Sequence, residues 1–356
     1  MGQDLALRQI SDAICDHLAT KSPSKPLVLS IHGPPGVGKS LFHQEAARAL
    51  YSTHPSPTLE CPGPDCRGYK VLFGLDFTAD EKHAQHAALR HALSEHMKST
   101  QEAFLVIEEY DKLDCEMRGF FRHLLEGGHV GNYSLARSIV VLESNTGYTS
   151  LHSMLQKAGK RENIAPEHAQ RHLKDLVFSR WQGQGCEQRT DTLKMVGLVD
   201  FFLPFFPLER QHVEQLFELR LQEKAATVAK DVCGGSGGDA CRVGLTWDAS
   251  VVKFLTDKVD FEGLYPIEGG KEVGTVMTRY VSRPVRQLVG QLTGAIGDDK
   301  DKKKNKGKRE RKKGGVGGRK VVGRLVVQNN KKLEVAVVDA KSDVEEEENI
   351  ENRAIL

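Results

Sequence analysis

The sequence predicts an α/β fold with a parallel sheet, followed by a smaller, mainly helical domain that ends in a β-hairpin. Three observations support this fold class. Short apolar runs alternate with stretches of helical periodicity, a glycine-rich turn joins an apolar strand to a helix, and 356 residues suffice for two domains with separate cores. No apolar run approaches the roughly 18 residues that a membrane span needs.

The glycine-rich turn is the most specific motif. Residues 26–32 form an apolar strand, residues 33–40 match G-x-x-x-x-G-K-[ST], and a helix begins at Lys39. Glycines let successive backbone N–H groups face phosphate oxygens. Lys39 is placed to reach the β- and γ-phosphates and Ser40 to bind Mg²⁺. ATP and Mg²⁺ are therefore the expected cofactors. The alternative is a chance glycine-rich turn. The residues predicted to line the loop are Gly33, Pro34, Pro35, Gly36, Val37, Gly38, Lys39, Ser40 and Leu41.

A first domain over residues 1–207 follows from the order of elements around this loop. A helix is expected before it, because apolar residues recur at helical spacing over 4–18. The other expected elements are strands at 69–77, within 104–112, at 138–142 and at 199–209, and helices at 81–96 and 165–180.

Two carboxylates end the apolar strand that begins at Phe104. An extra strand between the phosphate loop and this strand marks the branch of P-loop proteins that uses a glutamate to activate water. Glu108 would then support the metal, and Glu109 would polarise the attacking water. The alternative is a charged strand end beside a helix cap.

Two further residues are candidates for sensing the γ-phosphate. Asn145 follows the strand at 138–142 and could reach the γ-phosphate and the attacking water. An Asn-Thr-Gly turn is also common in loops, so position and order carry this assignment. Lys271 lies in the first turn of a helix, where a cation opposes the helix dipole, which favours an external anion over a solvated lysine.

The second domain is predicted over 208–298, as a helical lid with helices at 208–230 and 247–258 and a third from Lys271. A basic low-complexity insertion spans 299–320, a β-hairpin 321–339 and an acidic tail 340–356. The basic block is best interpreted as a solvated insertion, with nuclear import or binding to nucleic acid or acidic membrane as alternatives. It has no interleaved aromatic residues, so nucleic acid is not an expected partner.

Seven cysteines leave at least one unpaired. The close pairs Cys61–Cys66 and Cys233–Cys241 could be disulfides or metal ligands, and ordinary loop thiols are the favoured interpretation. The segment after Met1 carries no secretory signal pattern.

In this order, the motifs resemble an AAA+ ATPase of the Clp type, and three segments look like torsins. They are Gly2-Gln-Asp-Leu with Lys25 to Gly33, then Leu203-Pro-Phe-Phe-Pro-Leu-Glu209, and Gly269-Gly-Lys271. The resemblance covers about residues 1–290. It implies ATP hydrolysis at a domain junction that remodels a protein client, within a ring-like homo- or hetero-oligomer. It also implies the endoplasmic reticulum lumen or nuclear envelope. The chain as given has no signal peptide, so the alternatives are an incomplete N-terminus or a divergent cytoplasmic relative.

The chain departs from the torsin pattern at several positions. Torsins usually have Asn in place of Ser40, Asp in place of Glu108 and Cys in place of Gly270. Leu198 stands where Clp-type ATPases carry an arginine finger. Torsins also lack this arginine, and a membrane-anchored activator with an ATPase-like luminal domain supplies it. The resemblance therefore implies weak hydrolysis without the activator. After the strand at 69–77, Thr78-Ala-Asp-Glu-Lys-His lacks an aromatic–glycine pore motif, so threading of a substrate is not expected.

Three rival functions remain open. One is an autonomous Clp-type chaperone whose arginine finger is Arg180 or Arg189. Another is an ATP-gated binding scaffold with little turnover, which the Glu108 departure permits. A nuclear protein that uses the basic block ranks third.

Overall fold

The computed structural model describes residues 1–51, 66–77, 82–185, 188–233, 242–290, 320–328 and 332–339. It divides into two compact units, Met1–Leu208 and Glu209–Leu356. The acidic tail, residues 299–319 of the basic insertion, and the segment Thr78 to Glu81 lie outside the described residues. Within the described part, no helix combines the length and apolar character needed to cross a membrane.

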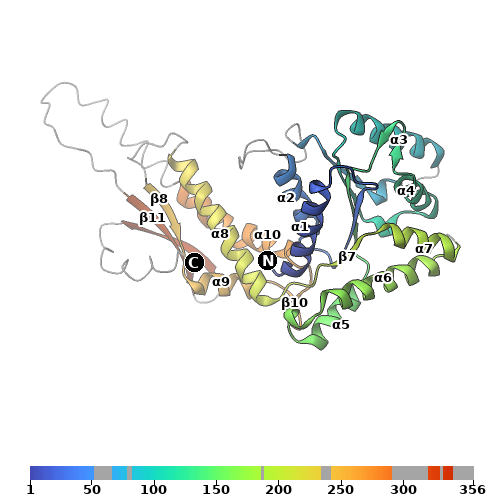
Figure 1. The fold of residues 1–356 in the computed structure, drawn as a ribbon. Helices are drawn as coiled ribbons and strands as arrows, with labels where there is room; N and C mark the ends of the chain where they lie inside the picture. Colours follow the sequence, from blue (N-terminus) through green and yellow to red (C-terminus); the bar gives the residue numbers. More distant parts are fainter. Residues whose placement is uncertain are drawn as a thin grey trace, which may run out of the picture. The chain divides into compact units, whose positions relative to one another are not determined.

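A five-stranded parallel sheet forms the centre of the first unit (Figure 1). Its strand order is β2-β3-β6-β1-β7, so β6 lies between β1 and β3. All five strands run in the same direction, so their carboxyl ends meet at one edge. The strands are β1 (Leu27–His32), β2 (Tyr69–Phe73), β3 (Phe104–Glu108), β6 (Ile139–Ser144) and β7 (Phe201–Pro204). This mixed α/β arrangement fits a P-loop-type domain, as the sequence predicted.

Helices lie on both sides of this sheet (Figure 1). One core packs α1 and α2 against the sheet face that presents Leu29, Ile31, Val106 and Val141. The α-helices are α1 (Asp4–Ala19), α2 (Lys39–Tyr51), α3 (Lys82–Ser99), α4 (Cys115–Gly127), α5 (Tyr148–Ala158), α6 (Pro166–Gly183) and α7 (Arg189–Leu198). Shorter elements are η2 (Gly74–Phe77), η3 (Tyr110–Lys112), η4 (Arg161–Asn163), β4 (His129–Val130) and β5 (Tyr133–Ser134).

The strands at 69–77 and 199–209 were predicted too long. β2 ends at Phe73, and Gly74–Phe77 turns into a 3-10 helix whose Gly74 packs against the backbone of Glu109. β7 ends at Pro204, although the apolar residues after it remain buried. A buried apolar run therefore continued the pattern of a strand beyond the residues that pair in the sheet.

The second unit contains helices and a three-stranded sheet. Its core joins α8 to α9 and α10 and includes Phe217, Leu255 and Leu325. Strands β11 and β12 pair antiparallel, and β8 pairs parallel to β11. The sequence analysis did not identify β8, so this unit is less helical than expected. Its elements are α8 (Arg210–Cys233), β8 (Arg242–Thr246), α9 (Ala249–Thr256), β9 (Phe261–Glu262), β10 (Tyr265–Pro266), α10 (Lys271–Tyr280), β11 (Lys320–Gln328) and β12 (Lys332–Asp339).

The cysteines differ in part from the expectation. Cys66 and Cys115 each take part in a disulfide bond, and Cys15 is a free, exposed thiol. The interpretation of the loop cysteines as ordinary thiols is therefore wrong for Cys66. Cys61 and Cys241 lie outside the described residues.

Candidate functional site

The glycine-rich loop connects β1 to α2 at the carboxyl edge of the sheet. Gly36 and Gly38 have φ angles of 75° and 99°, which side chains with a Cβ rarely adopt. Gly33 has a different reason: a Cβ there would lie 2.3 Å from the carbonyl oxygen of Phe205. The first glycine thus allows the loop to start against the end of β7, and the later two allow it to curl before Lys39.

Gln3 forms hydrogen bonds that connect this loop to the segment after β7. Its buried side-chain amide donates to the carbonyl of Phe206 at 2.9 Å and accepts from the Phe206 N–H at 3.0 Å. The same amide nitrogen lies 3.3 Å from the carbonyl of Val37, within the loop. The segment before α1 therefore ties the phosphate loop to the residues that follow β7. Sequence reasoning had assigned Gln3 no role.

Lys39 is the first residue of α2, and its side chain folds back over the glycine-rich loop. Its side chain is only 5% exposed, and its ammonium donates to the carbonyls of Gly33 and Pro34, both at 3.0 Å. It also donates to the Asn145 Oδ1 at 2.9 Å and lies 3.9 Å from Glu143. A buried ammonium surrounded by oxygen atoms of the loop is placed to meet a phosphate anion.

Asn145 is held on its other side by Asp111. The backbone N–H of Asn145 donates to Asp111 Oδ1 at 3.2 Å, and the Asp111 side chain is 4% exposed. Arg180 of α6 lies 3.5 Å from the second oxygen of Asp111. Two sequence candidates from different elements, Lys39 and Asn145, are therefore in direct contact, and Asp111 fixes the backbone of Asn145.

Glu108 and Glu109 follow one another at the carboxyl end of β3. Glu109 has a φ of 53°, in the left-handed region, and is the one described non-glycine residue with a positive φ. Gly74 accommodates this turn, because a Cβ at Gly74 would lie 2.4 Å from the Glu109 carbonyl oxygen. Left-handed backbone costs a residue with a Cβ about 1–2 kcal/mol, so the surrounding fold imposes this conformation on Glu109.

His43 and Glu143 complete the site, and sequence reasoning missed both. His43 is 1% exposed, and its Nε2 lies 2.9 Å from Glu108 and 3.4 Å from Glu143. Its Nδ1 lies 2.5 Å from the hydroxyl of Tyr69. Burial opposes the charged ring, but hydrogen bonds to Glu108 and Glu143 raise the pKa of His43 above its ordinary value.

A signal for both residues was present in the sequence. His43 follows Lys39 by four residues and so lies on the same side of α2, one turn further on. Glu143 lies near the end of β6, at the carboxyl edge of the sheet where the candidate strands meet.

The site offers oxygen donors that suit Mg²⁺. The Ser40 hydroxyl lies 3.3 and 3.5 Å from the two carboxylate oxygens of Glu143, to which it donates. Glu108 contacts His43, which in turn lies near Glu143. A hydroxyl and two carboxylates are the kind of ligands that Mg²⁺ binds together with substrate phosphates. Ser40 and Glu108, the predicted metal residues, are thus linked through Glu143 and His43.

Three other residues singled out in the sequence come from α7 and α10, elements that hold none of the site residues described above. Lys271 is exposed at the start of α10, in the second unit, after Gly270. Leu198 is the last residue of α7 and carries no charge. Arg189 begins α7 with its guanidinium over the Phe178 ring.

Comparison with known proteins finds sequence similarity to torsins. A family model described as Torsin matches residues 1–58, which include the phosphate loop. A "Torsin-like protein" of Drosophila melanogaster is 23% identical over 224 residues, 62% of this chain and 64% of the relative. A "Torsin-like protein" of Caenorhabditis elegans is 24% identical over 229 residues, 63% of this chain and 61% of the relative.

"Torsin-3A" of Rattus norvegicus is 26% identical over 220 residues, 60% of this chain and 53% of the relative. The chain thus spans between about half and two thirds of the length of the curated relatives that it matches.

Proposed function

The family match and the curated relatives support membership of the torsin family, and from this premise we propose that the chain is a torsin-like AAA+ ATPase. One observation carries the proposal. The buried ammonium of Lys39 contacts both the loop carbonyls and Asn145. This contact joins the phosphate loop to the strand end proposed to sense the γ-phosphate.

The proposed chemistry assigns one task to each side chain. Lys39 exchanges its carbonyl partners for the β- and γ-phosphates, and Asn145 orients the γ-phosphate and the attacking water. Glu109 accepts a proton from that water. Mg²⁺, held by Ser40 and Glu108 together with the phosphates, supplies charge neutralisation when bound. Lys271 belongs to the second unit, and its contact with the γ-phosphate remains a prediction.

We further propose that turnover depends on a partner. Leu198 ends α7 where related ATPases place an arginine finger, so the chain would need that guanidinium from an activator with an ATPase-like luminal domain. A missing finger lowers the rate by roughly 10³–10⁵-fold. Hydrolysis would then remodel a protein client within a ring-like assembly. The disulfide-bonded state of Cys66 and Cys115 favours an oxidising compartment such as the endoplasmic reticulum lumen.

An autonomous ATPase is the rival that one observation favours. Arg180 lies 3.5 Å from Asp111 and its side chain is 41% exposed, so its guanidinium is accessible to a neighbouring subunit. A binding scaffold is favoured by a different contact. Glu108 accepts a hydrogen bond from His43, which competes with metal support by the same carboxylate.

Steady-state ATP hydrolysis by the purified full chain, alone and with the luminal domain of a torsin activator, separates these functions. We expect slow hydrolysis alone and stimulation of at least about a hundredfold with the activator, because the activator supplies the missing guanidinium. Glu109→Gln should bind ATP and abolish the stimulated rate, whereas Lys39→Ala should lose ATP binding.

Each rival gives a different result. Fast hydrolysis by the chain alone, lost in Arg180→Ala, would establish the autonomous ATPase. Tight ATP binding with no turnover, with or without the activator, would support the ATP-gated binding scaffold.

A further inference from the structure

His43, Glu108 and Glu143 come from three elements that converge at the carboxyl edge of the sheet. Within the described residues, they form a group whose potential ligand atoms all lie within 4.8 Å of one another. His43 comes from α2, Glu108 from the end of β3 and Glu143 from β6. Such convergence from separate elements fixes the positions of the ligands before any ion binds.

The separations of His43 from its two carboxylate partners suit a single small ion. Ligand atoms about 2.0–2.2 Å from one metal, at octahedral or tetrahedral angles, are about 2.8–3.6 Å apart. The Nε2 of His43 lies 2.9 Å from Glu108 Oε1 and 3.4 Å from Glu143 Oε2. The imidazole therefore already stands at metal-ligand spacing from both carboxylates.

Tyr69 orients the histidine in the way that a metal site requires. Its hydroxyl lies 2.5 Å from His43 Nδ1, so Nδ1 is held by a second partner and Nε2 faces the carboxylates. Metal-binding histidines commonly use their other ring nitrogen in this way, and the contact fixes the tautomer and the ring plane. The ring of Tyr69 also lies against the imidazole, with centroids 5.8 Å apart.

The burial and the negative charge of the two glutamates both favour a bound cation. The side chains of His43, Glu108 and Glu143 are 1%, 18% and 10% exposed. Two carboxylates brought this close and this far from water repel one another unless a cation lies between them. Lys39 forms an ion pair with Glu143 at 3.9 Å and also donates hydrogen bonds to the loop and to Asn145. A divalent ion at His43 Nε2, in place of the ring proton, would neutralise both carboxylates in this cluster.

We propose that His43, Glu108 and Glu143 bind a divalent first-row transition-metal ion, such as Mn²⁺, Co²⁺ or Zn²⁺, in preference to Mg²⁺. Imidazole nitrogen is a ligand that these ions accept readily, whereas Mg²⁺ takes oxygen ligands almost throughout. This ion would use the Glu108 carboxylate that the proposed ATPase function assigns to Mg²⁺, so the proposal rests on that function and revises its metal, but its test requires no nucleotide.

Titration of the purified full chain with Co²⁺, without nucleotide, tests the proposal. Visible absorption reports the nitrogen and oxygen ligands of Co²⁺, and Mg²⁺ and Zn²⁺ serve as competitors. We expect one Co²⁺ per chain, displaced by Zn²⁺ but not by a tenfold excess of Mg²⁺. His43→Ala and Glu143→Gln should each weaken Co²⁺ binding by at least about tenfold, and Tyr69→Phe by about 10–100-fold through loss of orientation.

Two exposed residues of the first unit provide matched controls. Glu45→Gln removes an exposed carboxylate from α2, and His129→Ala removes an exposed imidazole, so both should bind Co²⁺ like the unchanged chain. Circular dichroism checks that each variant is folded. If His43→Ala does not fold, Glu143→Gln, which preserves size and shape, decides the outcome.

Co²⁺ binding that is equal in His43→Ala, Glu143→Gln and the controls would overturn the proposal, as would displacement by equimolar Mg²⁺. Protonated His43 would then be the cation that pairs the two carboxylates. ATP binding by a fluorescent analogue is measured separately, with Lys39→Ala as its control. Metal selectivity without ATP binding would refute the ATPase alone, and ATP binding without metal selectivity would refute this inference alone.

Discussion

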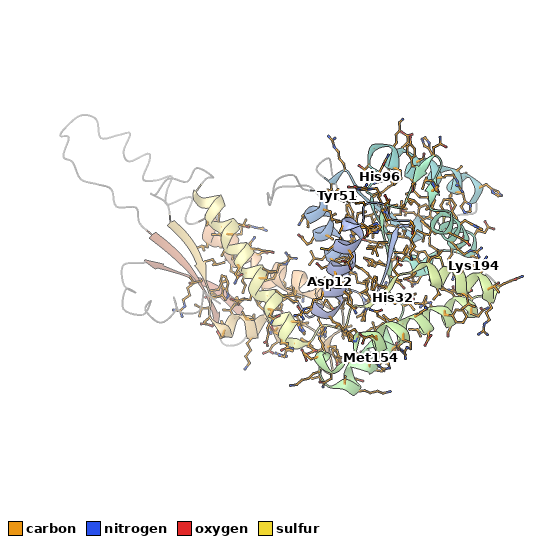
Figure 2. The ribbon with its side chains drawn as sticks, in the orientation of Figure 1. Asp12, His32, Tyr51, His96, Met154 and Lys194 are labelled. Atoms are coloured by element: carbon orange, nitrogen blue, oxygen red, sulfur yellow. The ribbon has the colours of Figure 1, made fainter. Side chains whose placement is uncertain are left out.

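His32 is a buried histidine at the last position of β1, directly before the phosphate loop. It is 2% exposed, and Figure 2 shows it among the packed side chains of the first unit. Its Nε2 lies 2.7 Å from the Ser30 hydroxyl, and its ring stacks on Phe202. Burial lowers the pKa of His32 to about 4, although Asp111 partly opposes this. The neutral ring is therefore part of the folded state.

The first unit should lose stability as the pH falls from about 6.5 to 4. Between these values the unfolded chain binds a proton at His32 that the folded chain excludes, so folding is penalised by up to about 3 kcal/mol at pH 4. Urea unfolding followed by Trp181 fluorescence in a Trp247→Phe background reports this unit, because the chain has two tryptophans.

His32→Gln cannot take up a proton in this range and should flatten the pH dependence, whereas His129→Ala at an exposed position should keep it. An unchanged slope in His32→Gln would mean that His32 is not the titrating group.

The sequence predicted most elements of the first unit, because the physics that forms each one is local. Apolar runs bounded by polar turns predicted β1, β3 and β6, and the glycine pattern predicted the loop before α2. The helix α4 also has a local signal that sequence reasoning did not use: Asp114 caps it by accepting from the Met117 N–H at 2.8 Å.

The parts that could not be predicted depend on contacts between elements. Lys39 and Asn145 were both identified, but their contact follows from the order of strands, with β6 placed beside β1. The meeting of His43 with Glu143 likewise needs the register of α2 against β6. In the second unit, β8 has partners more than 70 residues away along the chain, so nothing local distinguishes it.

Gly74 links the end of β2 to the turn at Glu109, and this contact makes a prediction for the element. Gly74→Ala would place a Cβ 2.4 Å from the Glu109 carbonyl oxygen, so the backbone of Glu109 must shift. We expect ATP hydrolysis to fall by about tenfold to a hundredfold, because Glu109, the proposed general base, would lose its alignment, with ATP affinity little changed.

Gly119→Ala is the matched control, since a Cβ at Gly119 in α4 meets no atom within 4 Å. That change should leave hydrolysis unaltered and stabilise the helix by about 0.5–1 kcal/mol. Equal activity of Gly74→Ala and the unchanged chain would show that the Glu109 turn tolerates displacement.

The residues proposed to act on nucleotide come from both units of the molecule. The first unit holds the phosphate loop, Glu109 and Asn145, and the second holds Lys271. Each unit has its own apolar core, so each can keep its internal geometry during a change in nucleotide state. Lys271 is proposed to sense the γ-phosphate, which ADP lacks.

Lys271→Ala should therefore reduce the preference of the full chain for ATP over ADP by about tenfold, the loss of a charge-assisted hydrogen bond of at least about 1.5 kcal/mol. Lys271 is exposed in the first turn of α10, where the helix dipole disfavours a cation, so its removal should not destabilise the second unit. Lys253→Ala, an exposed lysine in the last turn of α9, controls for loss of charge. Competition between a fluorescent ATP analogue and ADP gives the preference in each variant. The same ratio in both variants would remove Lys271 from nucleotide sensing and confine recognition of the γ-phosphate to the first unit.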